Sequence, residues 1–336
     1  MLRPMLAWRV PKYGPYRDVL ESADIPEPSA PKGGVVVKVA AAGLNFFDIL
    51  SIAGTYQIKL PPPFTPGTEA AGTVVEVGEG SRFAVGDRVI GSNIMGAFAE
   101  RMVVPDSGCF RIPDGMSDAE AAALLINYQT SYFGLTHRTA LAEGETLLVH
   151  GGAGGVGVAA IQLGKAFGAT VIATAGSPRK REVCTEAGAD HVIDYRNEDF
   201  VAAVKSLTRG RGADVIYDPV GGDVFDKSTK CIAWGGRLLV IGFAAGRIPE
   251  IKANRILLKN MAVVGLNWGG YQLHEPSLIV EAHERLCALY EAGSIAPVTF
   301  GDFGLADLPD ALAALAERRS HGKVVLRMAS RPCEGS

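Results

Sequence analysis

The chain has 336 residues, more than a single hydrophobic core usually holds, which predicts two domains. Hydrophobic residues make up 48% of it and charged residues 21%, as in globular proteins with a large core, and no apolar run approaches the length of a membrane span. The formal net charge of −3 gives no sign of a nucleic-acid-binding surface.

The N-terminal third has the character of a β-rich domain. Its first ten residues are interrupted by Pro4 and Arg9 and lack the apolar core of a signal peptide. Short β-branched runs at 34–40, 70–77 and 87–90, separated by Gly and Pro, predict strands. We therefore expect an all-β, barrel-like domain before residue 120, in a cytoplasmic protein.

Between about 121 and 270, strand-like runs alternate with helical segments. Six strands are predicted, at 146–150, 170–174, 190–194, 214–218, 237–242 and 261–266. Together they predict a doubly wound parallel sheet, in which ligands bind beyond the carboxyl ends of the strands.

The segment 150–157 is the most informative motif. Gly152, Gly154 and Gly157 fit G-x-G-x-x-G between an apolar strand and a helix at 158–167. Glycines are needed because the turn is tight, the backbone must approach a pyrophosphate, and the helix packs closely on its strand. Phosphates then meet free N–H groups and the positive end of the helix dipole. We expect a dinucleotide on Gly152, Ala153, Gly154, Gly155, Val156 and Gly157.

The residues after the strand at 170–174 indicate which dinucleotide is bound. No carboxylate follows that strand, where NAD-preferring folds usually hold the ribose 2′-hydroxyl. One hydroxyl and three cations follow instead and suit a 2′-phosphate: Ser177, Arg179, Lys180 and Arg181. Ser177 before Pro178 is also a good helix N-cap, and the two roles do not exclude each other. The missing acid favours NADPH over NADH.

The tail contains a predicted amphipathic helix at 277–292, short strands, and a helix near 307–319. These elements are too few to form a domain, so we expect them to complete the β-rich one. The predicted domains are residues 1–124, completed by 271–336, and residues 125–270.

Several motifs together carry a family resemblance: Asn45-Phe-Phe-Asp48, Gly54-Thr-Tyr56, Pro66-Gly-Thr-Glu-Ala-Ala-Gly72, Val85-Gly-Asp-Arg-Val89, the glycine loop, and Gly188-Ala-Asp190 leading to Asp194-Tyr195. They span nearly the whole chain, which resembles the medium-chain dehydrogenase/reductase superfamily and, within it, the zinc-free quinone oxidoreductases related to zeta-crystallin. The resemblance implies an α/β fold with a GroES-like β-rich catalytic domain, a Rossmann domain, and an active cleft between them.

The chain lacks the zinc ligands of the alcohol dehydrogenases in this superfamily. Those enzymes have a cysteine in the segment that matches 41–45, Gly-His-Glu where this chain has Gly67-Thr68-Glu69, and a four-cysteine lobe where it has 91–100. The cysteines here lie far apart, at 109, 184, 231, 287 and 333, which also disfavours a disulfide framework. We expect no metal, and a structural role for Glu69 at the turn after Pro66.

The resemblance also implies the catalytic residues. Asn45 and Asp48 match a pair near the nicotinamide and ribose, and Tyr56 matches a tyrosine of the cleft. From the residues alone, Asn45 and Asp48 equally fit a helix cap, and Tyr56 a packing position. A second cleft tyrosine of the family is replaced by Leu50, which makes the expected site more apolar.

Further cofactor contacts follow from the same resemblance. Lys180, Tyr195 and Arg318 match positions around the 2′-phosphate, with Arg319 as an alternative to Arg318. The remaining expected contacts are Thr130 along the pyrophosphate and backbone groups near the nicotinamide at Gly242, Phe243, Leu266 and Asn267. We expect packing or surface roles for the three histidines His137, His150 and His191.

Without a metal, hydride transfer suits an acceptor that is already electron-poor. We therefore expect a zinc-independent NADPH:quinone reductase, a homodimer, that acts on a small conjugated acceptor, either a quinone or an enone, with Tyr56 or water as the proton source. One alternative is NADPH-dependent C=C reduction of an enoyl-CoA, acryloyl-CoA or alkenal. Another is an NADPH-binding structural or RNA-binding protein, which the near-neutral charge disfavours.

Overall fold

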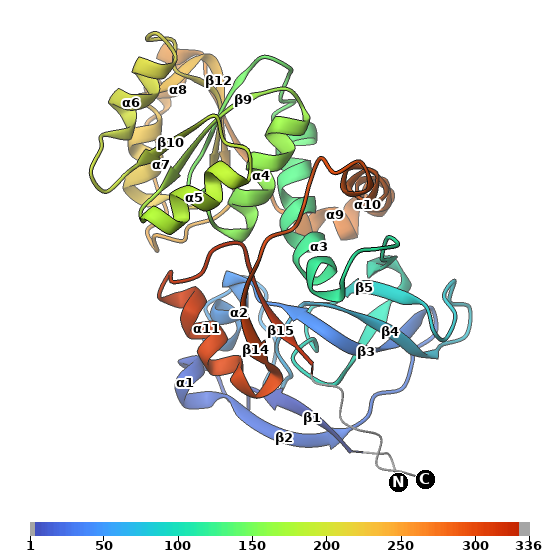
Figure 1. Ribbon diagram of the computed structural model, residues 1–336. Helices are drawn as coiled ribbons and strands as arrows, with labels where there is room; N and C mark the ends of the chain where they lie inside the picture. The colour runs from blue at the N-terminus through green and yellow to red at the C-terminus, as the bar shows by residue number, and fades with distance from the viewer. Residues whose placement is uncertain (1–3, 329–336) are drawn as a thin grey trace. The chain divides into compact units, whose positions relative to one another are not determined.

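The computed structural model describes residues 4–328 and divides into two compact units (Figure 1). Unit 1 comprises Met1–Leu125 and Val298–Ser336, and unit 2 comprises Ile126–Pro297. Cys333 lies outside the described residues. Within the described part, none of the helices combines the length and the apolar character that crossing a membrane requires.

Unit 2 is built on a six-stranded parallel sheet in the order β10-β9-β8-β11-β12-β13. Its strands are β8 (Thr146–Val149), β9 (Thr170–Ala175), β10 (His191–Asp194), β11 (Ala213–Asp218), β12 (Ile232–Val240) and β13 (Ala262–Gly265). This order reverses at β8, which confirms the predicted doubly wound Rossmann sheet.

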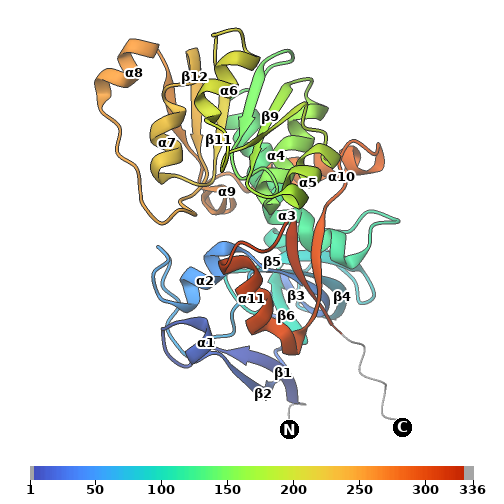
Figure 2. The ribbon, with the colours of Figure 1, turned by 60° about the vertical axis from the view of Figure 1, so that its left-hand side comes forward.

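Helices cover both faces of this sheet, with α4 and α5 on one side of the strands and α7 and α8 on the other (Figure 2). A π-helical turn, η2 (Gly134–Arg138), precedes the first strand of the sheet. The helices that follow it are α4 (Gly155–Ala166), α5 (Pro178–Glu186), α6 (Phe200–Leu207), α7 (Gly222–Ser228), α8 (Ala253–Lys259), α9 (Trp268–His274) and α10 (Pro276–Glu291). Apolar side chains of α6, β11 and β12 form one buried core, which includes Val204, Ile216 and Leu238.

The segment 271–297 belongs to unit 2, so the predicted return to the β-rich domain at residue 271 lies too early. Helix α10 was expected to help complete that domain. It is fixed instead within unit 2, where Gln129 Nε2 donates a hydrogen bond of 3.2 Å to the Ile279 carbonyl. Gln162 Nε2 likewise holds the following turn, at 2.9 Å from the Ala296 carbonyl.

Unit 1 is β-rich, with a seven-stranded sheet in the order β14-β15-β3-β4-β5-β7, in which β6 also pairs with β3, and a separate hairpin-like pair β1-β2. Its strands are β1 (Pro4–Arg9), β2 (Glu21–Pro26), β3 (Gly34–Gly43), β4 (Glu69–Val77), β5 (Arg88–Ser92), β6 (Arg101–Pro105), β7 (Cys109–Arg111), β14 (Thr299–Gly304) and β15 (Lys323–Arg327). The GroES-like prediction is confirmed.

Short helices complete unit 1: α1 (Tyr16–Val19), α2 (Phe46–Ile52), α11 (Leu308–Ala316), and the 3₁₀ turns η1 (Asp106–Gly108) and η3 (Leu305–Asp307). Helix α3 (Asp118–Phe133) contains the division between the units. Alternate residues of β3, among them Val35, Val37 and Val39, share a buried core with Leu308 and Leu312 of α11. The last strands and helix of the tail therefore do complete the β-rich unit, as predicted.

Candidate functional site

Unit 1 contains a buried polar cluster formed by Asn45, Glu69 and Lys323. The Lys323 ammonium donates to Asn45 Oδ1 at 2.7 Å and forms an ion pair with Glu69 Oε1. Asn45 Nδ2 donates to the same Glu69 oxygen at 2.9 Å, so each residue contacts the other two. The side chains of Lys323 and Glu69 are only 3% and 0% exposed. Water therefore screens these charges weakly.

The register of three strands brings this cluster together. Glu69 begins β4 and lies opposite Gly43, the last residue of β3, while Val325 of β15 pairs with Gly43 from the other side. A Cβ on Gly43 would lie 2.7 Å from Lys323 Cε and 3.0 Å from Glu69 Oε1. Glycine at this position therefore leaves the space that the ion pair occupies.

Asp48 supplies the carboxylate half of a capping box at the start of α2. Its Oδ2 accepts the Asn45 N–H at 2.7 Å, and its N–H donates to the Asn45 carbonyl. Burial raises the pKa of Asp48 to about 7, although the Asn45 N–H and the charge of Lys323 oppose this rise. The carboxyl group can therefore change protonation near neutral pH.

Tyr56 lies next to this helix and is half-buried. Its N–H donates to the Leu50 carbonyl at 3.2 Å, and its ring stacks on Phe47 with centroids 5.4 Å apart. Burial, and then the charge of Asp48, raise the pKa of its hydroxyl. The structure thus brings Asn45, Asp48 and Tyr56 together, within a single unit.

Lys323 was not predicted as a functional residue. Its partners Asn45 and Glu69 lie 278 and 254 residues away, and a lysine before an apolar run is ordinarily the exposed end of a strand. The structural role expected for Glu69 includes this ion pair. Among residues 4–328, no group of three or more His, Cys, Asp or Glu side chains is arranged to hold a metal ion.

In unit 2, two glycines of the loop after β8 lie where a side chain would collide with a neighbour. A Cβ on Gly157 would lie 2.3 Å from the Gly151 carbonyl oxygen, and one on Gly155 would lie 2.2 Å from Asn127 Nδ2. Gly154 is the N-cap of α4, whose first-turn N–H groups form the anion-binding end of the helix. Asn127, on α3, was not predicted to adjoin the loop. Thr130 follows it on the same helix face, and is partly exposed.

His150 fixes the base of the loop. Its Nδ1 lies 3.2 Å from Thr174 Oγ1 and its Nε2 2.9 Å from Ser228 Oγ. Because the Ser228 hydroxyl donates to the Val224 carbonyl, it accepts from Nε2–H, and Nδ1 then accepts from Thr174. Burial lowers the pKa of His150 to about 3, so the ring is neutral. This is the packing role expected for it.

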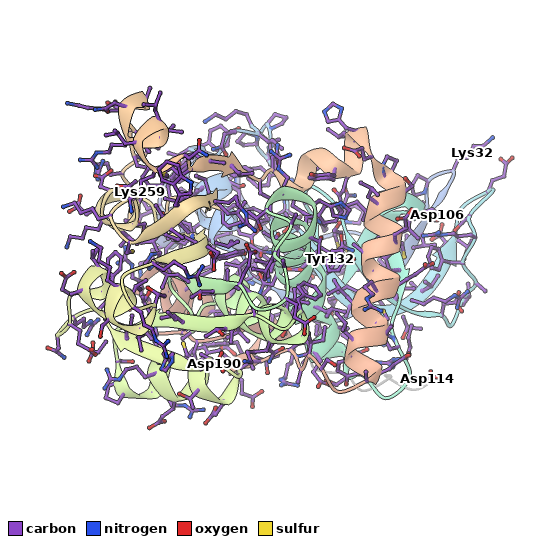
Figure 3. The ribbon with its side chains drawn as sticks, turned by 90° about the horizontal axis from the view of Figure 1, so that it is seen from above. Lys32, Asp106, Asp114, Tyr132, Asp190 and Lys259 are labelled. Carbon is purple, nitrogen blue, oxygen red and sulfur yellow. The ribbon has the colours of Figure 1, made fainter. Side chains whose placement is uncertain are left out.

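His137 and His191 occupy different surroundings. His137 packs against the rings of Phe133 and Tyr132, the latter labelled in Figure 3. His191 is exposed at the start of β10. The surroundings of these two histidines do not indicate a role in acid–base catalysis.

Two of the residues expected at the 2′-phosphate, Ser177 and Tyr195, adjoin Gly176. Ser177 caps α5, accepting the Lys180 N–H at 3.4 Å. A Cβ on Gly176 would lie 2.7 Å from the Tyr195 hydroxyl oxygen and 2.9 Å from Arg196 Nε, so the next strand's end adds a cation that the sequence did not indicate.

The other cations of this segment face carboxylates. Arg179 pairs with Glu182 at 3.2 Å and Glu186 at 3.1 Å, and Arg181 pairs with Asp194 at 2.5 Å. Arg318 belongs to unit 1, where it follows α11 with a φ of +56°.

The residues expected near the nicotinamide follow the carboxyl ends of β12 and β13, the same edge of the sheet as the glycine loop. Gly242 and Phe243 follow β12. The Leu266 N–H donates to the Val240 carbonyl at 3.1 Å, and Asn267 caps α9 by accepting the Gly270 N–H.

Comparisons with known proteins agree with these two units. An alcohol dehydrogenase GroES-like domain model matches residues 31–114, and a zinc-binding dehydrogenase model matches residues 155–282. The quinone oxidoreductase-like protein 2 homolog of Nematostella vectensis is 43% identical over 87% of this chain and 81% of that protein. The chain belongs to the quinone oxidoreductase branch of the medium-chain dehydrogenase/reductase superfamily.

Solved structures extend this family assignment. The Escherichia coli quinone oxidoreductase, solved with NADPH, has 30% identity and a TM-score of 0.88 over 96% of this chain and 99% of that one. The enoyl reductase CurK has 28% identity and a TM-score of 0.87 over 97% and 99%. The structures similar to this chain thus include a quinone oxidoreductase and an enoyl reductase, two names that refer to different hydride acceptors.

Proposed function

We propose that this protein is a zinc-independent NADPH:quinone reductase. The observation that carries the proposal is the presence of two sets of functional groups in one chain, one in each unit. Unit 2 has a glycine loop and a cation-rich turn without the acid that selects NAD. Unit 1 has the Asn45, Asp48 and Tyr56 constellation without a metal-binding group in the described residues.

The residues of unit 2 fit an NADP(H) molecule. Gly155 and Gly157 let the loop pack closely against Asn127 and against the Gly151 carbonyl, which gives the tight turn that a dinucleotide-binding loop needs, and the N-terminus of α4 supplies N–H donors. Tyr195 and Arg196, which lie next to Gly176, and Lys180 in the first turn of α5, whose N–H donates to the Ser177 hydroxyl, supply the groups for a 2′-phosphate. When bound, the cofactor supplies the hydride.

Unit 1 supplies a proton and an apolar wall. The Tyr56 hydroxyl, beside Asp48, is the group that orients the acceptor carbonyl and donates the proton. Leu50 keeps the surroundings apolar, which suits flat conjugated acceptors better than hydroxylated ones. A C=C reductase is the second candidate, favoured by the likeness to the CurK enoyl reductase.

Steady-state NADPH oxidation tests the proposal with 1,4-benzoquinone, an enone, crotonyl-CoA, and ethanol in the reverse direction. We expect turnover of the quinone, undiminished after treatment with a chelator. Tyr56→Phe should lower kcat roughly 100-fold if its hydroxyl is the general acid, while Tyr16→Phe, in the same unit, should not. Efficient oxidation of ethanol without reduction of any conjugated acceptor would refute the proposal, and turnover of crotonyl-CoA alone would favour the second candidate.

The partner that we propose is a second copy of the chain, bound along β13. The edge strand β10 directly follows Asp190, labelled in Figure 3, and ends with Asp194, and both carboxylates are in ion pairs. Strand β13, at the other edge, has no charged residue, and Leu257 and Leu258 nearby are 75% and 68% exposed. Uncharged edges bind further strands. Sedimentation should show a dimer that Val264→Lys dissociates; a wild-type monomer would refute this.

We also propose that the protein works in the cytoplasm. Cys109, Cys184, Cys231 and Cys287 are free thiols, which suits a reducing compartment. Burial raises the pKa of Cys109, Cys184 and Cys231 to about 12, so these thiols resist oxidation. Cell fractionation tests the location, and recovery in a membrane fraction would contradict it.

A further inference from the structure

Lys323 is a buried cation without an assigned role. It begins β15, and its ammonium contacts two side chains from other parts of unit 1, Asn45 and Glu69. Taking a lysine and a glutamate out of water costs more free energy than their attraction commonly returns, so an apolar pair would serve stability as well. The cluster is therefore better explained by what it positions.

The cluster fixes the orientation of the Asn45 amide. Oδ1 faces the cation of Lys323, and Nδ2 faces the anion of Glu69 at 2.9 Å and the Thr68 hydroxyl at 3.4 Å. A rotation of the amide by 180° would place its NH₂ against an ammonium and its oxygen against a carboxylate. Only one orientation is compatible with these partners.

The same residue passes this constraint to the start of α2. The Asn45 N–H donates to Asp48 Oδ2 at 2.7 Å, so Lys323, Asn45 and Asp48 form a continuous hydrogen-bonded series from β15 to the helix. The helix in turn carries Phe47, on which Tyr56 stacks. A displacement of Asn45 would therefore also displace Asp48 and Tyr56, the two groups that the proposed reaction uses.

We propose that Lys323 is a positioning residue, which through the Asn45 amide holds Asp48 and Tyr56 in their working places. The role rests on the proposed function, since it concerns those two groups. The charged and titratable groups that face Asp48 are Lys323 from β15, Glu69 from β4, and Tyr56 after α2. Lys323 lowers the pKa of Asp48, and Glu69 raises it.

The test compares two full-length variants that differ only in Lys323. Lys323→Met alone would leave the Glu69 carboxylate buried without its cation, and the resulting loss of stability would obscure a loss of positioning. The comparison is therefore made between Glu69→Gln and Glu69→Gln with Lys323→Met. Lys38→Met in the Glu69→Gln background is the matched control, because Lys38 is exposed on β3 of the same unit.

Two measurements follow, after a thermal melt has shown that each variant is folded. The Asp48 carboxyl is titrated by ¹³C NMR, with its signal assigned by its loss in Asp48→Asn. Loss of Lys323 should raise the pKa of Asp48, because both the cation and the held Asn45 N–H favour the ionised form. With 1,4-benzoquinone, kcat should fall about tenfold or more, and KM for NADPH should stay within about twofold. Lys38→Met should change neither.

The two readouts separate this inference from the proposed function. Folded variants in which Asp48 titrates at the same pH with and without Lys323 would overturn the positioning role, and so would an unchanged kcat. If the wild-type protein reduces no quinone, the proposed function fails, while the NMR titration still decides whether Lys323 holds Asp48.

Discussion

Two buried polar clusters, one in each unit, are built in opposite ways. The cluster of unit 1 is charged, with the Lys323 ammonium against the Glu69 carboxylate. The cluster around His150 in unit 2 is neutral, with the imidazole between two hydroxyl groups, Thr174 and Ser228. Both networks lie beside a proposed functional segment. The difference between them shows that burial alone does not determine the ionisation of a polar network.

The contrast has a physical origin. An uncharged hydrogen-bonded network loses little on leaving water if each group finds a partner, whereas an ion pair loses most of its hydration. A neutral network is thus sufficient where the task is to hold a loop, as His150 does. A charged network is retained where a fixed charge acts on a titrating neighbour, as Lys323 acts on Asp48.

The largest effect on the free energy of unfolding is predicted for a substitution that breaks the charged cluster. Lys323→Met should destabilise the protein by about 3–5 kcal/mol, because it leaves the Glu69 carboxylate buried without its cation. His150→Leu should cost less, about 1–3 kcal/mol, since only neutral hydroxyl groups lose partners. Urea denaturation measures both. The contrast fails if His150→Leu costs as much as Lys323→Met, or if adding Glu69→Gln to Lys323→Met does not recover stability.

The next prediction uses pH. For Asp48 the folded pKa of about 7 exceeds the ordinary 3.8, so its contribution to stability is complete below 3.8 and is lost as pH rises through 7. For His150 the folded pKa of about 3 lies below the ordinary 6.5, so its contribution is complete above 6.5 and is lost as pH falls towards 3. The two groups therefore oppose each other between 3.8 and 6.5.

Replacing either Asp48 or His150 should expose the effect of the other residue on the pH dependence of stability. Acidification from about pH 7 to pH 4.5 should destabilise Asp48→Asn more steeply than the wild type, and His150→Leu less steeply, by up to about 1.4 kcal/mol per pH unit for each group. Urea denaturation across this range provides the curves. Parallel curves for the wild type and both variants would show that neither pKa is displaced as described.

A smaller effect is predicted for the glycine that makes room for the ion pair. Gly43→Ala places a Cβ 2.3 Å from the Ala122 carbonyl oxygen as well as against Lys323, so it should cost about 1–3 kcal/mol. Gly304→Ala is the control in the same unit, because its nearest contact is an ordinary 3.4 Å to Asp307 Oδ2. Thermal denaturation compares them, and equal melting temperatures would remove the steric argument.

Those features of the fold that depend on local spacing could be predicted from the sequence. The glycine loop, five of the six Rossmann strands, and the helix at α11 follow from periodicity and turn residues, which act over a few positions. Strand β12 begins earlier than expected, because a register shift between Ala213 and Val215 of β11 leaves Trp234 on an exposed bulge. A bulge has no periodic signal.

Features that depend on distant partners could not be predicted. Periodicity showed that α10 has an apolar face, but not that Gln129 would hold it in unit 2. Lys323 gave no signal for the same reason, since its partners are set by the pairing of β15 with β3. Asn45 and Asp48 were found through motif resemblance, and the carboxyl bond at the start of α2 fits the cap that the residues also suggested.

The smallest effect on stability, but a clear one on binding, is predicted at the cations of unit 2. Unlike Lys323, Lys180 belongs to a short surface segment, so Lys180→Ala should change the free energy of unfolding by no more than about 0.5 kcal/mol. It should weaken NADPH about tenfold and leave NADH nearly unchanged, because one charge-assisted bond to the 2′-phosphate is lost. Arg179→Ala is the matched control, since Arg179 already pairs with Glu182 and Glu186. Fluorescence titration of both cofactors decides the matter: equal losses for NADPH and NADH, or an equal loss in Arg179→Ala, would remove Lys180 from the phosphate site.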